Sequence, residues 1–127
     1  METLAPTILV VDDEESNITL LKEMLQWAGY NTITASNGYE AVMAYITQTI
    51  DLTIVDMMMP GLSGFETAQW IKHARPNARI LLATGLRNIN ESHWKDMIVG
   101  LVFKPYNIDQ IYTAVEDALN VEPKITS

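Results

Sequence analysis

Five polar residues of this sequence stand where short apolar segments end. Two of them are the adjacent acids Asp12 and Asp13, which follow the segment TILVV. The others are Asp56, Thr84 and Lys104, and each of them ends or directly follows a further apolar segment. Three carboxylates, a hydroxyl and an ammonium form a set that can hold a hard divalent cation and stabilise phosphoryl oxygens, if the fold brings them together.

The charges of these residues set a physical condition on such a site. Two carboxylates ~4 Å apart repel each other by about 4 kcal/mol at an effective dielectric constant near 20. Lys104 offsets part of this repulsion, and a hard cation with oxygen ligands, Mg²⁺ or Mn²⁺, would offset more. With a cation, a lysine and a hydroxyl around it, the central carboxylate of Asp56 can act as a nucleophile toward phosphorus.

Short β-branched segments alternate with segments of helical spacing along the chain. Helical spacing is clear at Ile18, Leu21 and Leu25, and it recurs from Ile108 onward. This alternation predicts an α/β fold: a doubly wound, flavodoxin-like parallel sheet of five strands in the order 2-1-3-4-5, with five helices. The predicted strands cover residues 7–11, 31–35, 52–56, 79–83 and 100–104.

The fourth predicted helix has the weakest pattern. Residues 88–98 offer a possible capping box, with Asn88 followed by Glu91 three residues later. The segment has no glycine before the last strand, and its apolar face is ambiguous. We expect a short or irregular helix there.

The predicted sheet gives a reason to consider the polar residues together. In this kind of sheet, ligands bind beyond the carboxyl ends of the strands, at the switch point between the first and third strands. Each residue alone has an ordinary interpretation: an acidic turn at a helix start for the acid pair, a turn cap for Asp56, a surface charge for Lys104. Their coincidence at one edge of the sheet favours a functional site.

The motifs ILVVDDEE, IVDMMMPGLSGFE, LLAT and VFKPY resemble the receiver domain of response regulators in two-component and phosphorelay signalling. The resemblance covers about residues 6–120 and leaves 121–127 as a C-terminal tail, so we expect one domain over residues 1–127. It implies that Asp56 accepts a phosphoryl group from a phosphohistidine on a histidine kinase or histidine phosphotransfer protein. The reaction would be self-catalysed, without turnover of a separate substrate, and would switch contacts with a downstream protein partner or an attached domain.

The resemblance also implies a metal site. Asp13 and Asp56 would ligate Mg²⁺ (or Mn²⁺) directly, and Asp12 would act through water. The backbone carbonyl of Met58 would be a further ligand, which leaves the methionine side chain free to line the entrance. We expect Met58 and the apolar Leu86 to screen the site from attacking water.

The remaining implied roles concern the last two strands. Lys104 would pair with phosphoryl oxygens, and Thr84 would turn inward to hydrogen-bond the phosphoryl group. The Lys104–Pro105 peptide is expected to be cis, which aims the lysine into the site. Gly85 is small enough to leave the site open.

Leu101 departs from the family pattern. Many members have a tyrosine or phenylalanine at this place, and its ring turns inward together with the threonine. A leucine cannot repeat that movement, so the switch is either muted or routed through another aromatic residue. The candidates are Phe103, Tyr106 and Trp94.

Composition excludes several other classes of protein. The chain has 127 residues, a net charge of -8 and no cysteine. The charge argues against direct binding to nucleic acid and to an anionic membrane surface, and the missing cysteines exclude disulfides and thiol catalysis. The sequence shows no signal peptide and no membrane span, so we expect a cytoplasmic protein without membrane insertion.

Two alternatives stay open. The chain could be a pseudo-receiver, an interaction module that keeps the fold without being phosphorylated, although the complete polar set counts against it. It could also be a receiver excised from a hybrid histidine kinase or a larger regulator. A metal-dependent phosphatase or a flavodoxin-like cofactor protein is disfavoured, because the sequence has no Asp-x-Asp pair after the first strand and no glycine-rich phosphate loop.

Overall fold

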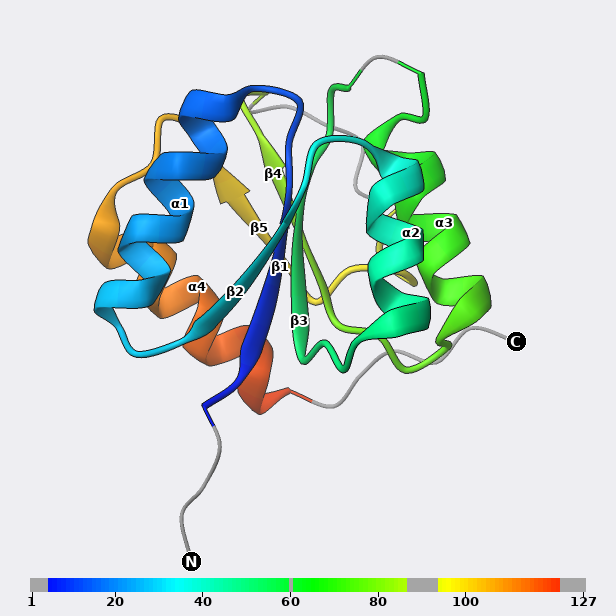
Figure 1. The fold of residues 1–127 in the computed structure, drawn as a ribbon. Helices are drawn as coiled ribbons and strands as arrows, with labels where there is room; N and C mark the ends of the chain where they lie inside the picture. The colour runs from blue at the N-terminus through cyan, green and yellow to red at the C-terminus, as the bar shows by residue number, and fades with distance from the viewer. Residues whose placement is uncertain (1–4, 60, 87–93, 122–127) are drawn as a thin grey trace, which may run out of the picture.

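A parallel sheet covered by helices on both faces forms the centre of the molecule (Figure 1). The computed structural model describes residues 5–59, 61–86 and 94–121. The strands pair in the order β2-β1-β3-β4-β5, and all four pairings are parallel. This confirms the predicted doubly wound sheet. The strands are β1 (Thr7–Val11), β2 (Asn31–Ala35), β3 (Leu52–Asp56), β4 (Ile80–Thr84) and β5 (Gly100–Phe103).

The described residues form four of the five predicted helices. The four are α1 (Glu15–Trp27), α2 (Gly38–Thr47), α3 (Gly64–Ala74) and α4 (Ile108–Asn120). The remaining helix was predicted at residues 88–98, and residues 88–93 of that range lie outside the described residues.

Tertiary packing accounts for the part of that segment that is described. Residues 94–97 form a turn, in which the backbone N–H groups of Met97 and Ile98 both donate to the carbonyl of Trp94. Trp94 is buried, and its ring meets Phe65 edge to face at a centroid distance of 5.0 Å. Burial of these side chains against α3 stabilises this turn.

The core consists of two layers, one on each face of the sheet. Along β1, Ile8 and Val10 pack in the cluster that includes α1 and α4, while Leu9 and Val11 pack in the cluster that includes α2 and α3. Strands β3 and β4 are buried throughout. Because the middle strands are covered on both faces, a charged residue is tolerated only at their ends.

Side-chain caps set where three of the helices begin. Asn37 accepts the Glu40 N–H at the start of α2, and Asn107 accepts the N–H groups of Asp109 and Gln110 at the start of α4. Ser63 and Glu66 form a reciprocal capping box at α3. These caps end the connections that leave the carboxyl edge of the sheet and so limit where its polar residues lie. No helix in the described parts of the chain is long and apolar enough to cross a membrane.

Candidate functional site

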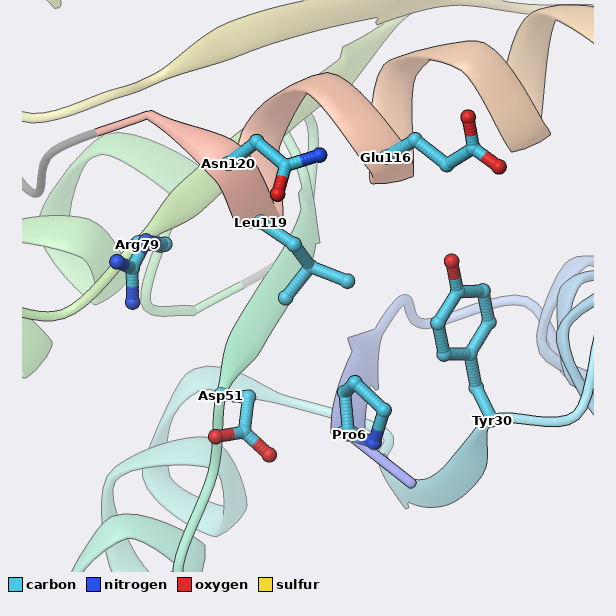
Figure 2. Close-up of a pocket in the computed structure, with 7 residues that line it drawn as sticks. All are labelled: Pro6, Tyr30, Asp51, Arg79, Glu116, Leu119 and Asn120. Atoms are coloured by element: carbon cyan, nitrogen blue, oxygen red, sulfur yellow. The ribbon is translucent and has the colours of Figure 1, made fainter. Parts of the chain in front are cut away.

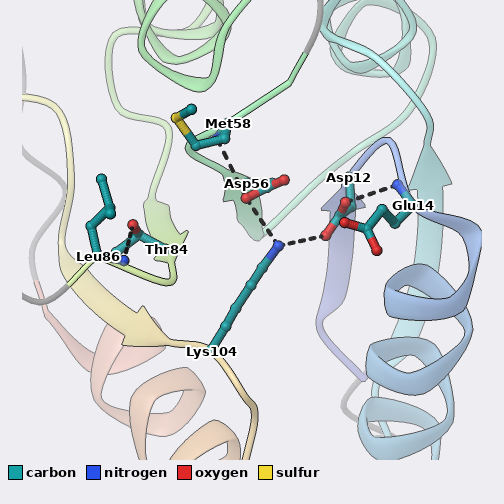
Figure 3. A network of polar contacts seen from close by, with 7 residues as sticks. All are labelled: Asp12, Glu14, Asp56, Met58, Thr84, Leu86 and Lys104. Carbon is teal, nitrogen blue, oxygen red and sulfur yellow. Dashed lines mark hydrogen bonds and ion pairs between the residues drawn. The ribbon is translucent and has the colours of Figure 1, made fainter.

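The carboxyl ends of the central strands bring the predicted polar residues together (Figure 3). Asp12 directly follows β1, and Asp56 is the last residue of β3. Thr84 ends β4, where it lies opposite Phe103 of β5, and Lys104 comes next. Parallel pairing puts these ends at one edge, as the sequence predicted.

One ammonium group is shared by two buried carboxylates. The Lys104 Nζ lies 3.1 Å from Asp56 Oδ1 and 3.3 Å from Asp12 Oδ2. Asp12 is 1% exposed and Asp56 is 5% exposed. Buried charges are costly unless they are paired and hydrogen-bonded, so Lys104 is needed to hold both acids in this arrangement.

The titration of this pair follows from the same contacts. Burial raises the pKa of Asp56; the hydrogen bond from Lys104 opposes that rise, and the neighbouring Asp12 carboxylate adds to it. Burial alone would lower the pKa of Lys104, but Asp56 and Asp12 outweigh it, and the pKa is raised above its usual value. Lys104 is therefore charged at neutral pH.

Asp13 completes an acidic cluster. One carboxylate oxygen from each of Asp12, Asp13 and Asp56 can be chosen so that all three lie within 4.8 Å of one another. Asp13 is exposed, whereas the other two are buried. A single lysine does not balance three carboxylates, and an all-oxygen donor set is the kind that Mg²⁺ prefers. The residues present therefore fit a hard divalent cation.

Backbone groups hold the two buried acids in place. The Glu14 N–H donates to Asp12 Oδ1 at 2.9 Å, and the Met58 N–H lies 3.4 Å from Asp56 Oδ1. The Met58 side chain is 67% exposed beside the site. Neither backbone contact could be predicted from residue types, because both depend on the path of the chain after a strand ends. The role of the Met58 carbonyl as a metal ligand stays a prediction.

Thr84 is buried at the same edge. Its Oγ1 accepts the Leu86 N–H at 3.0 Å, and its carbonyl accepts the Lys104 N–H at 2.9 Å. A Cβ built on Gly85 would meet no described atom within 4 Å, which agrees with an open approach. The inward movement of Thr84 stays a prediction.

The predictions for the residues around Lys104 had different outcomes. The Lys104–Pro105 peptide is cis, as predicted. Leu101 is half-buried and packs against the core on the side of α2 and α3. Tyr106 is half-buried on the opposite side of the sheet, and its hydroxyl oxygen is buried without a hydrogen-bond partner among the described residues. The sequence indicated Tyr106 only as an aromatic ring and gave no sign of this hydroxyl.

Comparison with known proteins decides the family. Residues 8–116 match the family described as the response regulator receiver domain. The chain belongs to this family. Receiver domains are phosphorylated on an aspartate, bind Mg²⁺ at an acidic pocket, and interact with histidine kinases or phosphotransfer proteins.

Individual relatives of this receiver domain differ in length. It is 34% identical over 115 residues to sporulation initiation phosphotransferase F of Bacillus subtilis. This match covers 88% of this chain and 92% of that protein. It is 44% identical over 77 residues to the alkaline phosphatase synthesis transcriptional regulatory protein PhoP of the same organism. This match covers 61% of this chain. That match spans only 32% of PhoP, so the chain corresponds to a part of this longer relative.

A solved structure supports the likeness of the fold. The response regulator TrrA of Thermotoga maritima, in complex with Mg²⁺ and BeF, is 37% identical, with a TM-score of 0.77. The alignment covers 89% of this chain and 98% of that one. The receiver fold therefore extends over nearly all of the chain.

Proposed function

We propose that this receiver domain accepts a phosphoryl group on Asp56 in a Mg²⁺-dependent reaction, with a phosphohistidine on a histidine kinase or phosphotransfer protein as donor. The main support is the single ammonium of Lys104 shared between two buried carboxylates, Asp12 and Asp56. An arrangement made only for stability would gain from replacing such buried charges by apolar residues.

Four residues would hold the cation. Asp13 and Asp56 would ligate it directly through their carboxylates, Asp12 would act through water, and Met58 would contribute its backbone carbonyl. Bound there, Mg²⁺ (or Mn²⁺) would neutralise charge on the phosphoryl oxygens and lower the repulsion between them and the acids. The close approach of the three carboxylates supports this assignment.

The transfer step needs a nucleophile and positioned charges. A carboxylate oxygen of Asp56 forms a bond to phosphorus as the phosphorus–nitrogen bond of the donor phosphohistidine breaks, and the leaving imidazole keeps the electron pair and then takes up a proton. Lys104, charged and within 3.1 Å of Asp56, stabilises the phosphoryl oxygens electrostatically. No separate substrate is turned over.

Thr84 is suited to respond to a phosphoryl group on Asp56. Its hydroxyl oxygen already accepts the Leu86 N–H, and its own proton is still available for donation to a phosphoryl oxygen. A phosphoryl group on Asp56 adds charge beside Thr84 and Lys104 and shifts a two-state equilibrium on the face formed by β4, β5 and α4. This shift would change contacts with a downstream protein or with another domain of a longer protein.

The experiment is incubation with Mg²⁺ and a small acyl phosphate, followed by intact-mass measurement. We expect one phosphoryl group on the wild type, none on Asp56→Asn, and none when Mg²⁺ is chelated. The matched control is Asp51→Asn, which removes a carboxylate at the far end of β3 and leaves labelling unchanged. A wild type that neither labels nor binds beryllofluoride would instead support a pseudo-receiver.

A further inference from the structure

Helix α2 carries apolar residues on its outer side as well as on the side that faces the core. Tyr39, Met43 and Ile46 are 62%, 57% and 61% exposed. Their spacing of i, i+4 and i+7 places the three side chains on one stripe of the helix. Among the ten described residues of α2, Glu40 alone is charged. Apolar residues all round a helix are typical of a buried helix, so α2 has the composition of a helix that is covered on its outer side.

Trp70 of α3 extends this stripe. Helices α2 and α3 pack side by side on one face of the sheet (Figure 1). Their alignment follows from two close approaches: a Cβ on Gly38 would collide with Thr67 Oγ1, and Arg75 Nη2 donates to the Tyr45 carbonyl at 3.3 Å. Trp70 is 55% exposed and lies three residues after Thr67, on the side of α3 that faces α2. We call Tyr39, Met43, Ile46 and Trp70 the α2–α3 patch.

The area of the α2–α3 patch can be compared with the area that a protein interface needs. Two aromatic rings and two long apolar side chains, each more than half exposed, offer roughly 400 Å² of apolar surface. Specific interfaces at the small end of the range bury about 600 Å² on each partner. The patch with its polar rim reaches this size, and its aromatic residues and methionine are the types enriched in interface cores.

The charges around the patch favour a second copy of this chain as its partner. Glu40 and Glu66 lie in the first turns of α2 and α3, at one end of the patch. His73 and Arg75 lie at the last turn and the C-cap of α3, at the other end, and all four residues are exposed. A two-fold axis across the middle of the patch turns the second copy end for end, so that each acidic end faces a basic end. The helix dipoles are then antiparallel as well.

We propose that the α2–α3 patch is the interface of a symmetric dimer, in which the α2 helices of two copies of this chain pack antiparallel. Met43 lies near the middle of α2 and meets its own counterpart close to the two-fold axis, while Tyr39 of each copy meets Ile46 of the other. Trp70 closes the apolar centre of the interface beside them. The association does not depend on the proposed phosphorylation, because no residue of the patch belongs to that site.

Sedimentation equilibrium of the unmodified chain tests the association. The wild type should pass from the monomer mass to twice that mass, with a dissociation constant on the order of 100 μM. Trp70→Ser should weaken the dimer roughly tenfold or more. The matched control is Trp27→Ser, which removes a tryptophan that is 86% exposed at the end of α1 and should leave the dimer unchanged. A wild type that stays monomeric at millimolar concentration, growth beyond a dimer, or equal weakening by both variants would overturn the proposal.

Single cysteines test the antiparallel geometry, and they decide the proposal also if Trp70→Ser does not fold. The chain has no cysteine of its own, so each introduced thiol can pair only with its counterpart in the second copy. A disulfide needs Cα atoms within about 7 Å of each other, a condition that a residue near the two-fold axis meets. Under mild oxidation, Met43→Cys should give mainly a disulfide-linked dimer, whereas Trp27→Cys should stay mainly monomeric. Equal cross-linking of the two variants, or none in Met43→Cys, would overturn the proposed dimer.

Discussion

The two ends of the sheet carry similar residues in different states. At the carboxyl end, Asp12 and Asp56 are buried and share Lys104. The amino end contains a cavity of about 410 Å³ (Figure 2). Its lining also mixes acids, a base, a phenol and apolar side chains: Pro6, Tyr30, Asp51, Arg79, Glu116, Leu119 and Asn120.

Two charged side chains at the amino end hydrogen-bond to backbone groups. Asp51 Oδ2 accepts the Thr7 N–H at 2.7 Å, and Arg79 Nε donates to the Val121 carbonyl at 3.1 Å. Asp51 and Glu116 are exposed to water. Hydrated charges of this kind need no counter-ion and gain little from pairing. Buried acids that must share one cation, rather than the size of a cavity, distinguish the functional end from the other.

The largest difference between the two ends is expected when their basic residues are removed. Lys104→Met leaves two buried carboxylates unpaired and should lower the free energy of unfolding by about 3 kcal/mol at pH 7. Arg79→Met, at the amino end, should cost less than about 1 kcal/mol. Urea unfolding of the two variants and the wild type would measure both changes.

The pH dependence of this loss has a defined sign. Without the lysine, the pKa of Asp56 in the folded state rises further above its unfolded value near 3.9. The loss is therefore present above the folded-state pKa of Asp56 and fades as the pH falls toward about 4. An equal loss for Lys104→Met and Arg79→Met at pH 7 would remove the distinction between the ends.

Two glycines near the site, Gly64 and Gly85, differ in the space around them. A Cβ on Gly64 would lie 2.3 Å from the Asp56 carbonyl oxygen and 2.7 Å from the Met57 Cα, and backbone atoms cannot turn away. Gly64→Ala should therefore destabilise the protein by about 2 kcal/mol and reduce labelling by acyl phosphate. Gly85→Ala meets open space, and both its stability and its labelling should match the wild type. Similar stability of the two variants would show that the turn after β3 is more adaptable than its packing indicates.

A smaller effect of opposite sign is expected from Asp56→Asn without Mg²⁺. Since burial raises the pKa of Asp56, the folded state binds this proton more tightly than the unfolded state, and the ionised group destabilises the fold at pH 7. The variant should be more stable by on the order of 1 kcal/mol at pH 7, and the gain should vanish near pH 4. Asp51→Asn, whose carboxylate is exposed, should show no such pH-dependent gain. A gain for Asp56→Asn that is equal at both pH values would contradict the assigned cause.

The smallest effect on stability is expected at the rim of the site. Met58 and Leu86 are 67% and 48% exposed, and their backbone N–H groups bind Asp56 and Thr84. Met58→Asn and Leu86→Glu should leave the melting temperature nearly unchanged, but each should shorten the phosphoryl lifetime severalfold, because a polar side chain there can hold the attacking water. The check is a timed loss of label after the donor is removed. Unchanged rates of phosphoryl loss in both variants would contradict the screening of the site by these apolar side chains.

The sequence predicted the sheet and its polar edge because strand ends are visible in it. Strands β1, β3 and β4 end abruptly, and the residues at or just after their ends are the ones that meet. Only the end of the helix predicted at 88–98 is described, and its residues 94–97 form a turn in which Trp94 is buried against Phe65, a contact distant in sequence. Short-range patterns contain no information about such a contact.

Two features of the site also lay beyond sequence reasoning. The sharing of one ammonium by Asp12 and Asp56 depends on side-chain geometry, and Lys104 stands 92 residues from Asp12 along the chain. The unpaired Tyr106 hydroxyl depends on which atoms are absent around it among the described residues. The sequence therefore predicted which residues meet, and the structure was needed to show which of their atoms have partners.

The most direct test of the account is to locate the phosphoryl group. The labelled wild type would be reduced with borohydride, which converts an acyl-phosphorylated aspartate to homoserine, and then mapped by peptide mass spectrometry. We predict conversion at Asp56 alone, and only when Mg²⁺ was present during labelling. Conversion at Asp12, Asp13 or Asp51, or conversion at Asp56 that does not depend on Mg²⁺, would contradict it.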